Sequence, residues 1–214
     1  MVKPVTLGAA LAMLAGIASA SDLRPGDING ATPGLVLAAS TGQETAAPAV
    51  GAPFKAAPLH EAAFFGRTDD IRALLERGAD PNAPDAQGWS PLNWAAGFAG
   101  AEIVAMLIEA GADVTATDPN GWTSLHWAAG MGSPETIRAL VAAGAAVDAQ
   151  ETGMGWCPIH EAAANGSPEN VAALLDAGAD PQARNLLGVT PYDLARKNPR
   201  MLGSGVLDRL RPAR

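Results

Sequence analysis

Apolar residues recur along residues 53–200 with a period of about 33 residues, and each period contains two short apolar segments. The first segment of each period carries a pair of alanines, such as Ala62 and Ala63. The second places apolar residues at helical spacing, as in Ile71, Leu74 and Leu75. Equivalent positions are occupied in the later periods by Val104, Leu107 and Ile108, by Ile137, Leu140 and Val141, and by Val171, Leu174 and Leu175. The pattern predicts two short helices in every unit.

The first segment of each unit repeats one motif. It reads Ala57-Pro58-Leu59-His60-Glu61-Ala62-Ala63 in the first copy and Thr123-Ser124-Leu125-His126-Trp127-Ala128-Ala129 in the third. The apolar residue at the third place of the motif recurs at intervals of 33, 33, 34 and 33 residues, at Leu59, Leu92, Leu125, Ile159 and Tyr192. A Gly-Ala-Asp motif follows each second segment at Gly78, Gly111 and Gly178, and reads Gly-Ala-Ala at Gly144. A period this regular indicates a stack of repeated units.

The residues at the segment ends predict where each helix begins and ends. Ser90 and Thr123 are good N-caps, and Ser133 and Ser167 precede a Pro-Glu pair that suits a first helical turn. The glycines of the Gly-Ala-Asp motif predict a left-handed residue just past each second helix. An Asp-x-x-Gly turn, as at Asp85, then predicts a short hairpin finger between units.

These motifs are similar to the Thr-Pro-Leu-His-x-Ala-Ala and Gly-Ala-Asp signatures of ankyrin-repeat proteins, and the resemblance covers about residues 53 to 200. It implies an all-α ankyrin-repeat solenoid of stacked helix-turn-helix units with β-hairpin fingers. The expected repeats span residues 53–84, 85–117, 118–150 and 151–184, and residues 185–214 form a capping repeat. Since one helix pair cannot bury its own apolar face, stability is expected to come from contacts between neighbouring repeats.

The N-terminal segment has a different pattern. Residues 1–20 combine Lys3, an apolar run and the small residues Ala18-Ser19-Ala20, which predicts a signal peptide. Residues 21–52 are rich in Ala, Gly, Pro and Thr and are interpreted as a flexible linker. With the resemblance to exported bacterial ankyrin-repeat proteins, this predicts a periplasmic or secreted protein. The segment 30–39 echoes the repeat motif faintly, so a short helix that covers the first repeat is an alternative there.

Charge and residue types exclude several functions. Removal of residues 1–20 takes away Lys3 and no acid, which leaves 13 basic and 22 acidic residues and a net charge of −9. Such a chain repels phosphate backbones, so neither nucleic acid nor an anionic membrane is expected as a partner. The three histidines occupy one motif position in separate repeats, and helices pack ~8–10 Å apart, so they are too far apart to share a metal ion. They are His60, His126 and His160.

No catalytic motif is present, so neither an enzyme activity nor a cofactor is expected. The single cysteine, Cys157, stands where the motif has a capping Thr. A buried structural residue is the favoured interpretation, and a redox-sensitive or intermolecular thiol is the alternative. A small-molecule substrate is not expected either.

Aromatic residues provide the candidate binding surface. Trp89, Trp122 and Trp156 each follow the glycine of a finger and predict an exposed stripe with one ring per repeat. In ankyrin-repeat proteins the residues after the Ala-Ala pair face the concave surface, and here four of them are large and apolar: Phe64, Phe65, Phe98 and Met131. Two interpretations remain open, in which these residues bind a protein partner or the tryptophan rings lie flat and stiffen the array. Trp94 and Trp127, inside the first helices, are expected to be core residues.

The capping repeat carries a basic run, Arg196, Lys197, Arg200, Arg209, Arg211 and Arg214. It is interpreted as a solvated surface, with a docking patch for an acidic partner as the alternative. The sequence therefore predicts a protein-binding scaffold that acts outside the cytoplasm. Some exported ankyrin-repeat proteins accompany haem peroxidases or catalases and others neutralise toxic proteins, so an accessory or protective role for a redox or stress enzyme, or a toxin-neutralising role, is the alternative function.

Overall fold

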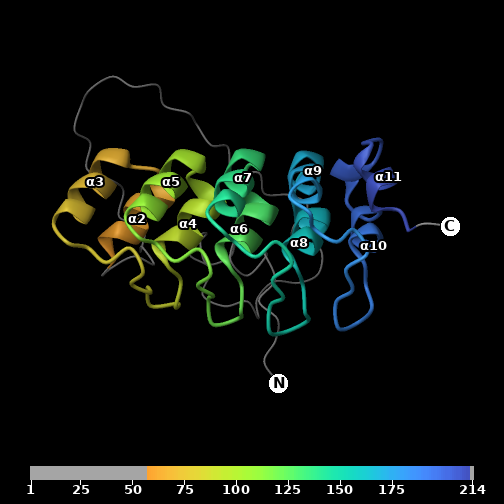
Figure 1. Ribbon diagram of the computed structural model, residues 1–214, viewed down its shortest axis with the longest axis horizontal. Coiled ribbons are helices and arrows are strands. Elements are labelled where there is room, and N and C mark those ends of the chain that lie inside the picture. Colours follow the sequence, from red (N-terminus) through yellow and green to blue (C-terminus); the bar gives the residue numbers. More distant parts are fainter. Residues whose placement is uncertain (1–56, 213–214) are drawn as a thin grey trace, which may run out of the picture. The chain divides into compact units, whose positions relative to one another are not determined.

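The computed structural model describes residues 57–212. These residues hold four consecutive helix pairs and a shorter C-terminal unit (Figure 1). The predicted signal peptide, linker and alternative helix within residues 30–39 lie outside the described residues. The pairs are α2 (Pro58–Phe65) with α3 (Thr68–Glu76), α4 (Pro91–Phe98) with α5 (Ala101–Glu109), α6 (Ser124–Met131) with α7 (Pro134–Ala142), and α8 (Pro158–Asn165) with α9 (Pro168–Asp176). The last unit consists of α10 (Pro191–Ala195), the 3₁₀ turn η2 (Pro199–Met201) and α11 (Val206–Leu210).

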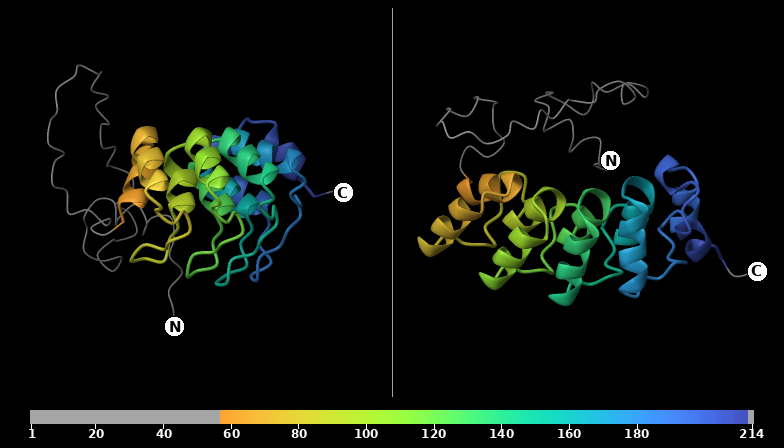
Figure 2. Two further views of the ribbon diagram at one scale, coloured as in Figure 1. Left: turned by 60° about the vertical axis from the view of Figure 1, so that its left-hand side comes forward. Right: turned by 90° about the horizontal axis from the view of Figure 1, so that it is seen from above.

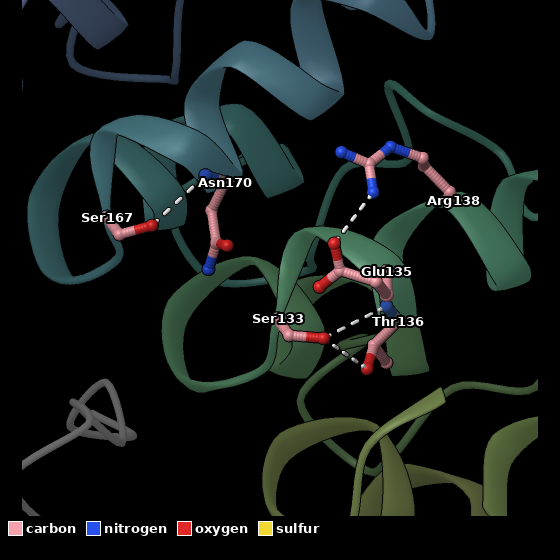
Figure 3. A network of polar contacts seen from close by, with 6 residues as sticks. All are labelled: Ser133, Glu135, Thr136, Arg138, Ser167 and Asn170. Atoms are coloured by element: carbon pink, nitrogen blue, oxygen red, sulfur yellow. Dashed lines mark hydrogen bonds and ion pairs between the residues drawn. The ribbon is translucent and has the colours of Figure 1, made fainter. Parts of the chain in front are cut away.

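The predicted N-caps are confirmed. The Ser90 hydroxyl accepts a hydrogen bond from the Asn93 N–H, and Thr123 forms the equivalent capping box with His126 at the start of α6. Ser133 caps α7 by accepting from the Thr136 N–H at 3.2 Å, and Ser167 caps α9 in the same way (Figure 3). These side chains satisfy backbone donors that have no partner within the helix.

The predicted ends of the second helices are also confirmed. Gly78, Gly111, Gly144 and Gly178 all have positive φ angles, between 85° and 97°. Their N–H groups donate to carbonyls of the last helical turn, as Gly111 does to Ile108 at 2.9 Å. Glycine adopts this left-handed conformation without the steric cost that a Cβ atom would add.

Neighbouring units stack through their first helices. Helix α4 packs against α2 and α6, and α8 packs against α6 and α10, while the second helices make a parallel layer of contacts. The Ala-Ala pairs and the motif leucines at these contacts are buried, including Ala95, Ala96, Leu92 and Leu125. Because alanine leaves almost no side chain between the helices, consecutive helices can approach closely and exclude water from the shared core.

The fingers all project from the same side of the stack (Figure 2). Each is closed by a carboxylate or amide at its base: Asp85 accepts hydrogen bonds from the N–H groups of Gln87 and Trp89, and Asp118 accepts the equivalent pair in the next finger. The β-pairing is shorter than the predicted hairpins, because the described fingers contain one isolated bridge, between Thr117 and Thr123, and no extended strand.

The third finger, at the start of the fourth repeat, accommodates the one-residue insertion that interrupts the 33-residue period. Its base carries Glu151 in place of aspartate, and the carboxylate accepts hydrogen bonds from the N–H groups of Gly153, Met154 and Trp156. The longer glutamate side chain therefore spans the longer turn. The insertion changes the finger and leaves the helix pair that follows it intact.

Candidate protein-binding surface

The last residue of each first helix forms a series along the stack, here called the helix-end row: Phe65, Phe98, Met131 and Asn165. Phe65 is 56% exposed, and the other three side chains are partly exposed. Met131 lies against the preceding repeat, because a Cβ atom built on Gly97 would be 3.3 Å from its terminal methyl carbon. The row thus presents apolar side chains on the first three repeats and an amide on the fourth.

A cluster of aromatic rings supports the apolar part of this row. Phe64 contacts Phe65, Phe98 and Trp94, with ring centroids 4.9, 4.8 and 5.5 Å apart. Trp94 then contacts Trp89, which contacts Trp127 of the next repeat at 4.3 Å. Trp127 contacts Trp122 at 5.2 Å, so the rings form one continuous series through three repeats. These seven residues are called the aromatic cluster: Phe64, Phe65, Trp89, Trp94, Phe98, Trp122 and Trp127.

The prediction that the finger tryptophans form an exposed stripe is wrong for Trp89. Its side chain is only 6% exposed, because it lies between Trp94 of its own repeat and Trp127 of the next. Trp122 and Trp156 are partly exposed. Trp94 and Trp127 are buried, which confirms the prediction that they are core residues. The surface open to a partner therefore contains the phenylalanines, Met131, Trp122 and Trp156, while Trp89 supports it from beneath.

The buried tryptophans have unequal polar partners. Trp94 donates its indole N–H to the Asp85 carboxylate at 2.8 Å. In the next repeat the corresponding atoms, Nε1 of Trp127 and Oδ2 of Asp118, are both buried and lack a hydrogen-bond partner. Burial raises the pKa of Asp118, and hydrogen bonds from the Trp122 and Asn120 N–H groups partly offset that rise. The third repeat thus keeps the aromatic packing of the second repeat without its tryptophan–aspartate hydrogen bond.

The aromatic cluster ends at Glu161, a residue that the sequence analysis did not single out. Glu161 occupies the motif position of Trp94 and Trp127, and it is only 2% exposed. A Cβ atom built on Gly130 would lie 2.8 Å from its Oε1 atom, which receives a hydrogen bond from the Asn165 side-chain amide at 2.6 Å. Burial raises the pKa of this carboxyl to about 7. An acid at a position where two other repeats hold tryptophan is the signal that could have identified it.

The motif histidines bind backbone groups of their own and the following units. His126 Nδ1 accepts from the Thr123 N–H, and its Nε2 atom lies 3.0 Å from the Trp156 carbonyl oxygen. His160 makes the equivalent contacts to Cys157 and Val189, and His60 Nε2 contacts the Ala83 and Trp89 carbonyls. Each ring therefore links the start of its helix or its own turn to the backbone of the following finger.

Burial sets the protonation of these rings. It lowers the pKa of His126 to about 4, and it lowers those of His60 and His160 as well. The three rings are therefore neutral at pH 7, when one ring nitrogen donates a hydrogen bond and the other can accept one. Among residues 57–212, no three His, Cys, Asp or Glu side chains are grouped so that they could hold a metal ion.

A protein-family model matches the helix pairs described above. Two matches to the family model for ankyrin repeats cover residues 24–118 and 103–185, which is well over half of the chain. The chain belongs to the ankyrin-repeat family. The first match begins at residue 24, within the segment that the sequence analysis interprets as a linker. None of the curated proteins matches the chain.

Membership confirms the predicted all-α ankyrin solenoid. Ankyrin repeats are indicative of a protein-interaction scaffold and are typically non-catalytic. In the part of the chain that the structure describes, no helix has the length and apolar character required to cross a membrane.

The lone cysteine occupies a structural position within the fourth ankyrin repeat. Cys157 is the N-cap of α8 and is 1% exposed, which confirms the favoured interpretation of a buried residue. Burial raises the pKa of its thiol to about 11, so the reactive thiolate is scarce at pH 7. Both observations disfavour the alternative of a redox-sensitive thiol.

The C-terminal unit departs from the repeat motif at the start of its first helix. Asp193 replaces the motif histidine and binds the Thr190 hydroxyl and N–H, which caps α10. In the first, third and fourth repeats the motif histidine contacts a carbonyl of the following finger, whereas Asp193 bonds at the start of its own helix. Arg196 and Lys197 follow α10 and are exposed, and Arg200 donates to the Asn165 carbonyl oxygen at 3.4 Å. This contact places Arg200 beside Asn165, at the polar end of the helix-end row.

Proposed function

We propose that this ankyrin array binds another protein through the helix-end row and the exposed part of the aromatic cluster. The observation that carries the proposal is a continuous aromatic series whose outer members, Phe64, Phe65, Phe98 and Trp122, remain open to solvent. Aromatic side chains and Met are enriched in the cores of protein interfaces, and tryptophan frequently dominates binding energy. Trp156, which is partly exposed, adds a further ring in the third finger.

Rigid support strengthens the proposal. Trp89, Trp94 and Trp127 hold the outer rings from beneath, so these rings lose little conformational freedom when a partner binds. Preorganised surfaces bind more tightly, since the entropic cost of ordering has already been met in the free protein. The aromatic cluster thus serves both interpretations of the sequence: its buried rings stiffen the array, and its outer rings form the proposed binding surface.

We further propose that the protein acts outside the cytoplasm and catalyses no reaction. The signal-peptide pattern of residues 1–20 supports the first part, and the absence of a catalytic motif from the sequence supports the second. Cell fractionation with N-terminal sequencing tests the location. A mature chain beginning at Ser21 in the extracytoplasmic fraction supports it, and an intact N-terminus in the cytoplasmic fraction contradicts it.

The binding proposal is tested by affinity capture from an extracytoplasmic extract with the wild type and two variants. Phe65→Ser combined with Met131→Ser removes apolar side chains from the helix-end row. Leu187→Ser is the matched control, because Leu187 is an exposed apolar residue at the tip of the last finger. A protein retained by the wild type and the control and lost by the double variant supports the proposal. Equal retention by all three proteins contradicts it.

A further inference from the structure

The helix-end row changes chemical character along its length. Its first three members are apolar, and beside them Arg67 is paired with Glu61 at 3.3 Å while its guanidinium lies 4.8 Å from the centre of the Phe65 ring. The cation at this end is therefore neutralised by a carboxylate. The fourth member, Asn165, is polar and lies next to the capping unit.

The opposite end carries three exposed cations that form no salt bridge among the described residues. Within residues 57–212, no salt bridge involves Arg196, Lys197 or Arg200, whereas Arg67, Arg72, Arg138, Arg209 and Arg211 each pair with a carboxylate. Residues 191–200 contain three basic residues and one acid, Asp193, in a chain of net charge −8. Asp193 accepts hydrogen bonds from Thr190 and also attracts Arg196, so the cluster keeps a net positive charge of three bases against one acid.

Three contacts join this basic cluster to the row. Arg200 binds the Asn165 backbone carbonyl, the Asn165 amide binds Glu161, and Glu161 lies against Gly130, which precedes Met131 in α6. The guanidinium of Arg196 lies 5.8 Å from the centre of the Tyr192 ring, one helical turn earlier in the chain. The contact of Arg200 with Asn165 therefore joins the basic cluster to the polar end of the helix-end row, and the two form the surface to which the inference applies.

We infer that this surface binds an extended protein segment with apolar side chains at one end and carboxylates at the other. The apolar side chains contact Phe65, Phe98 and Met131, and the carboxylates contact Arg196, Lys197 and Arg200. This inference rests on the proposed function and specifies the chemistry of the partner. Complementary charge fixes the direction in which the segment lies, and it rejects basic segments.

Repeat geometry sets the spacing within the bound segment. Neighbouring helices stand ~8–10 Å apart and an extended chain advances ~3.3 Å per residue, so each repeat corresponds to about three residues. Apolar residues are expected about three positions apart, and the carboxylates about six positions beyond the last of them, since Met131 and the basic cluster lie two repeats apart.

The inference is tested by selecting binders from a displayed library of random sixteen-residue peptides. The wild type is compared with Arg196→Gln/Lys197→Gln and with the control Arg72→Gln/Arg138→Gln. The control removes two exposed cations from second helices and changes the net charge equally. An Arg196→Lys/Lys197→Arg variant retains the charge at the site. Binding constants of the selected peptides are measured by fluorescence anisotropy at low and high salt.

The expected peptides combine apolar residues with Asp or Glu at one end, and they bind the Arg196→Gln/Lys197→Gln variant about tenfold more weakly. The control and the charge-retaining variant are expected to bind these peptides with the affinity of the wild type. In 0.5 M salt the difference in affinity between the wild type and Arg196→Gln/Lys197→Gln becomes smaller, because salt screens exposed charges. Apolar peptides without acidic enrichment, or equal binding by all variants, would overturn the inference and leave the proposed function standing. Selection of no peptide that depends on Phe65 or Met131 would overturn both.

Discussion

Glu161 provides a direct test of the packing beneath the helix-end row. Its carboxyl is buried between α6 and α8 and, among residues 57–212, receives a side-chain hydrogen bond from Asn165 alone. Glu161→Gln keeps the size of the side chain and an oxygen that can accept the Asn165 hydrogen bond. The substitution therefore removes the ionisable group and little else.

The expected effect depends on pH, and its sign follows from the raised pKa. Burial raises the pKa of Glu161 from 4.5 to about 7, so the folded protein holds the proton more tightly than the unfolded chain. This contribution to stability is fully present below pH 4.5 and is lost as the pH rises to about 7. One pKa unit corresponds to about 1.4 kcal/mol, so a glutamate at this position costs about 3 kcal/mol above pH 7.

Urea unfolding of wild type and Glu161→Gln, followed by circular dichroism at pH 4.5 and pH 8, measures this difference. The gain in unfolding free energy from the substitution should be about 3 kcal/mol larger at pH 8 than at pH 4.5. Other groups titrate in this range, including His126, but they titrate in both proteins and cancel in the comparison. Glu135→Gln is the control, because Glu135 is exposed and paired with Arg138, so its loss should give no gain at pH 8.

A gain that is the same at both pH values would refute the reasoning. It would mean that the Glu161 carboxyl is solvated in the folded protein and that its hydrogen bond to Asn165 does not report a buried position. A loss of stability at pH 8 would contradict the sign of the pKa shift itself.

Three further substitutions test the packing and hydrogen bonds of the repeats. Trp89→Ala should lower the free energy of unfolding by about 3–5 kcal/mol, because it empties a buried site between two rings, and a loss below 1 kcal/mol in urea unfolding would contradict its burial. Trp122→Ala should destabilise less and weaken binding to a captured partner by about 2 kcal/mol, so unchanged affinity in calorimetry would remove this ring from the interface. Asn93→His should stabilise the array by about 1 kcal/mol, since Asn93 Nδ2 is buried without a partner and a histidine there could donate to the Trp122 carbonyl as His126 does to Trp156. A loss of stability in the same unfolding assay would show that the ring does not fit.

Much of the fold could be predicted because the residues that begin and end each helix are close to it in sequence. Ser90, Thr123 and the helix-ending glycines act within a few residues of their helices, so their roles follow from sequence position alone. The 33-residue period then determines which units become neighbours. The histidine contacts were also predictable, since a ring fixed at a helix start can reach the turn of the following unit.

The burial of Trp89 was not predictable from its position in the finger. It depends on Trp127, a residue 38 positions later that becomes its neighbour only when the repeats stack. Large rings at the same motif position in two adjacent repeats were the available signal. The role of Glu161 likewise depends on the preceding repeat, where Gly130 leaves space that its carboxyl fills. Contacts between repeats, unlike caps and turns, require the stacked structure.

The most direct test of a binding surface at the ends of the first helices is amide hydrogen exchange of the array, with and without a captured partner. Bound partner should slow exchange in the C-terminal turns of α2, α4 and α6 and in the finger around Trp122, while α3, α5 and α7 exchange as in the free protein. Protection confined to the second helices would contradict the proposed surface.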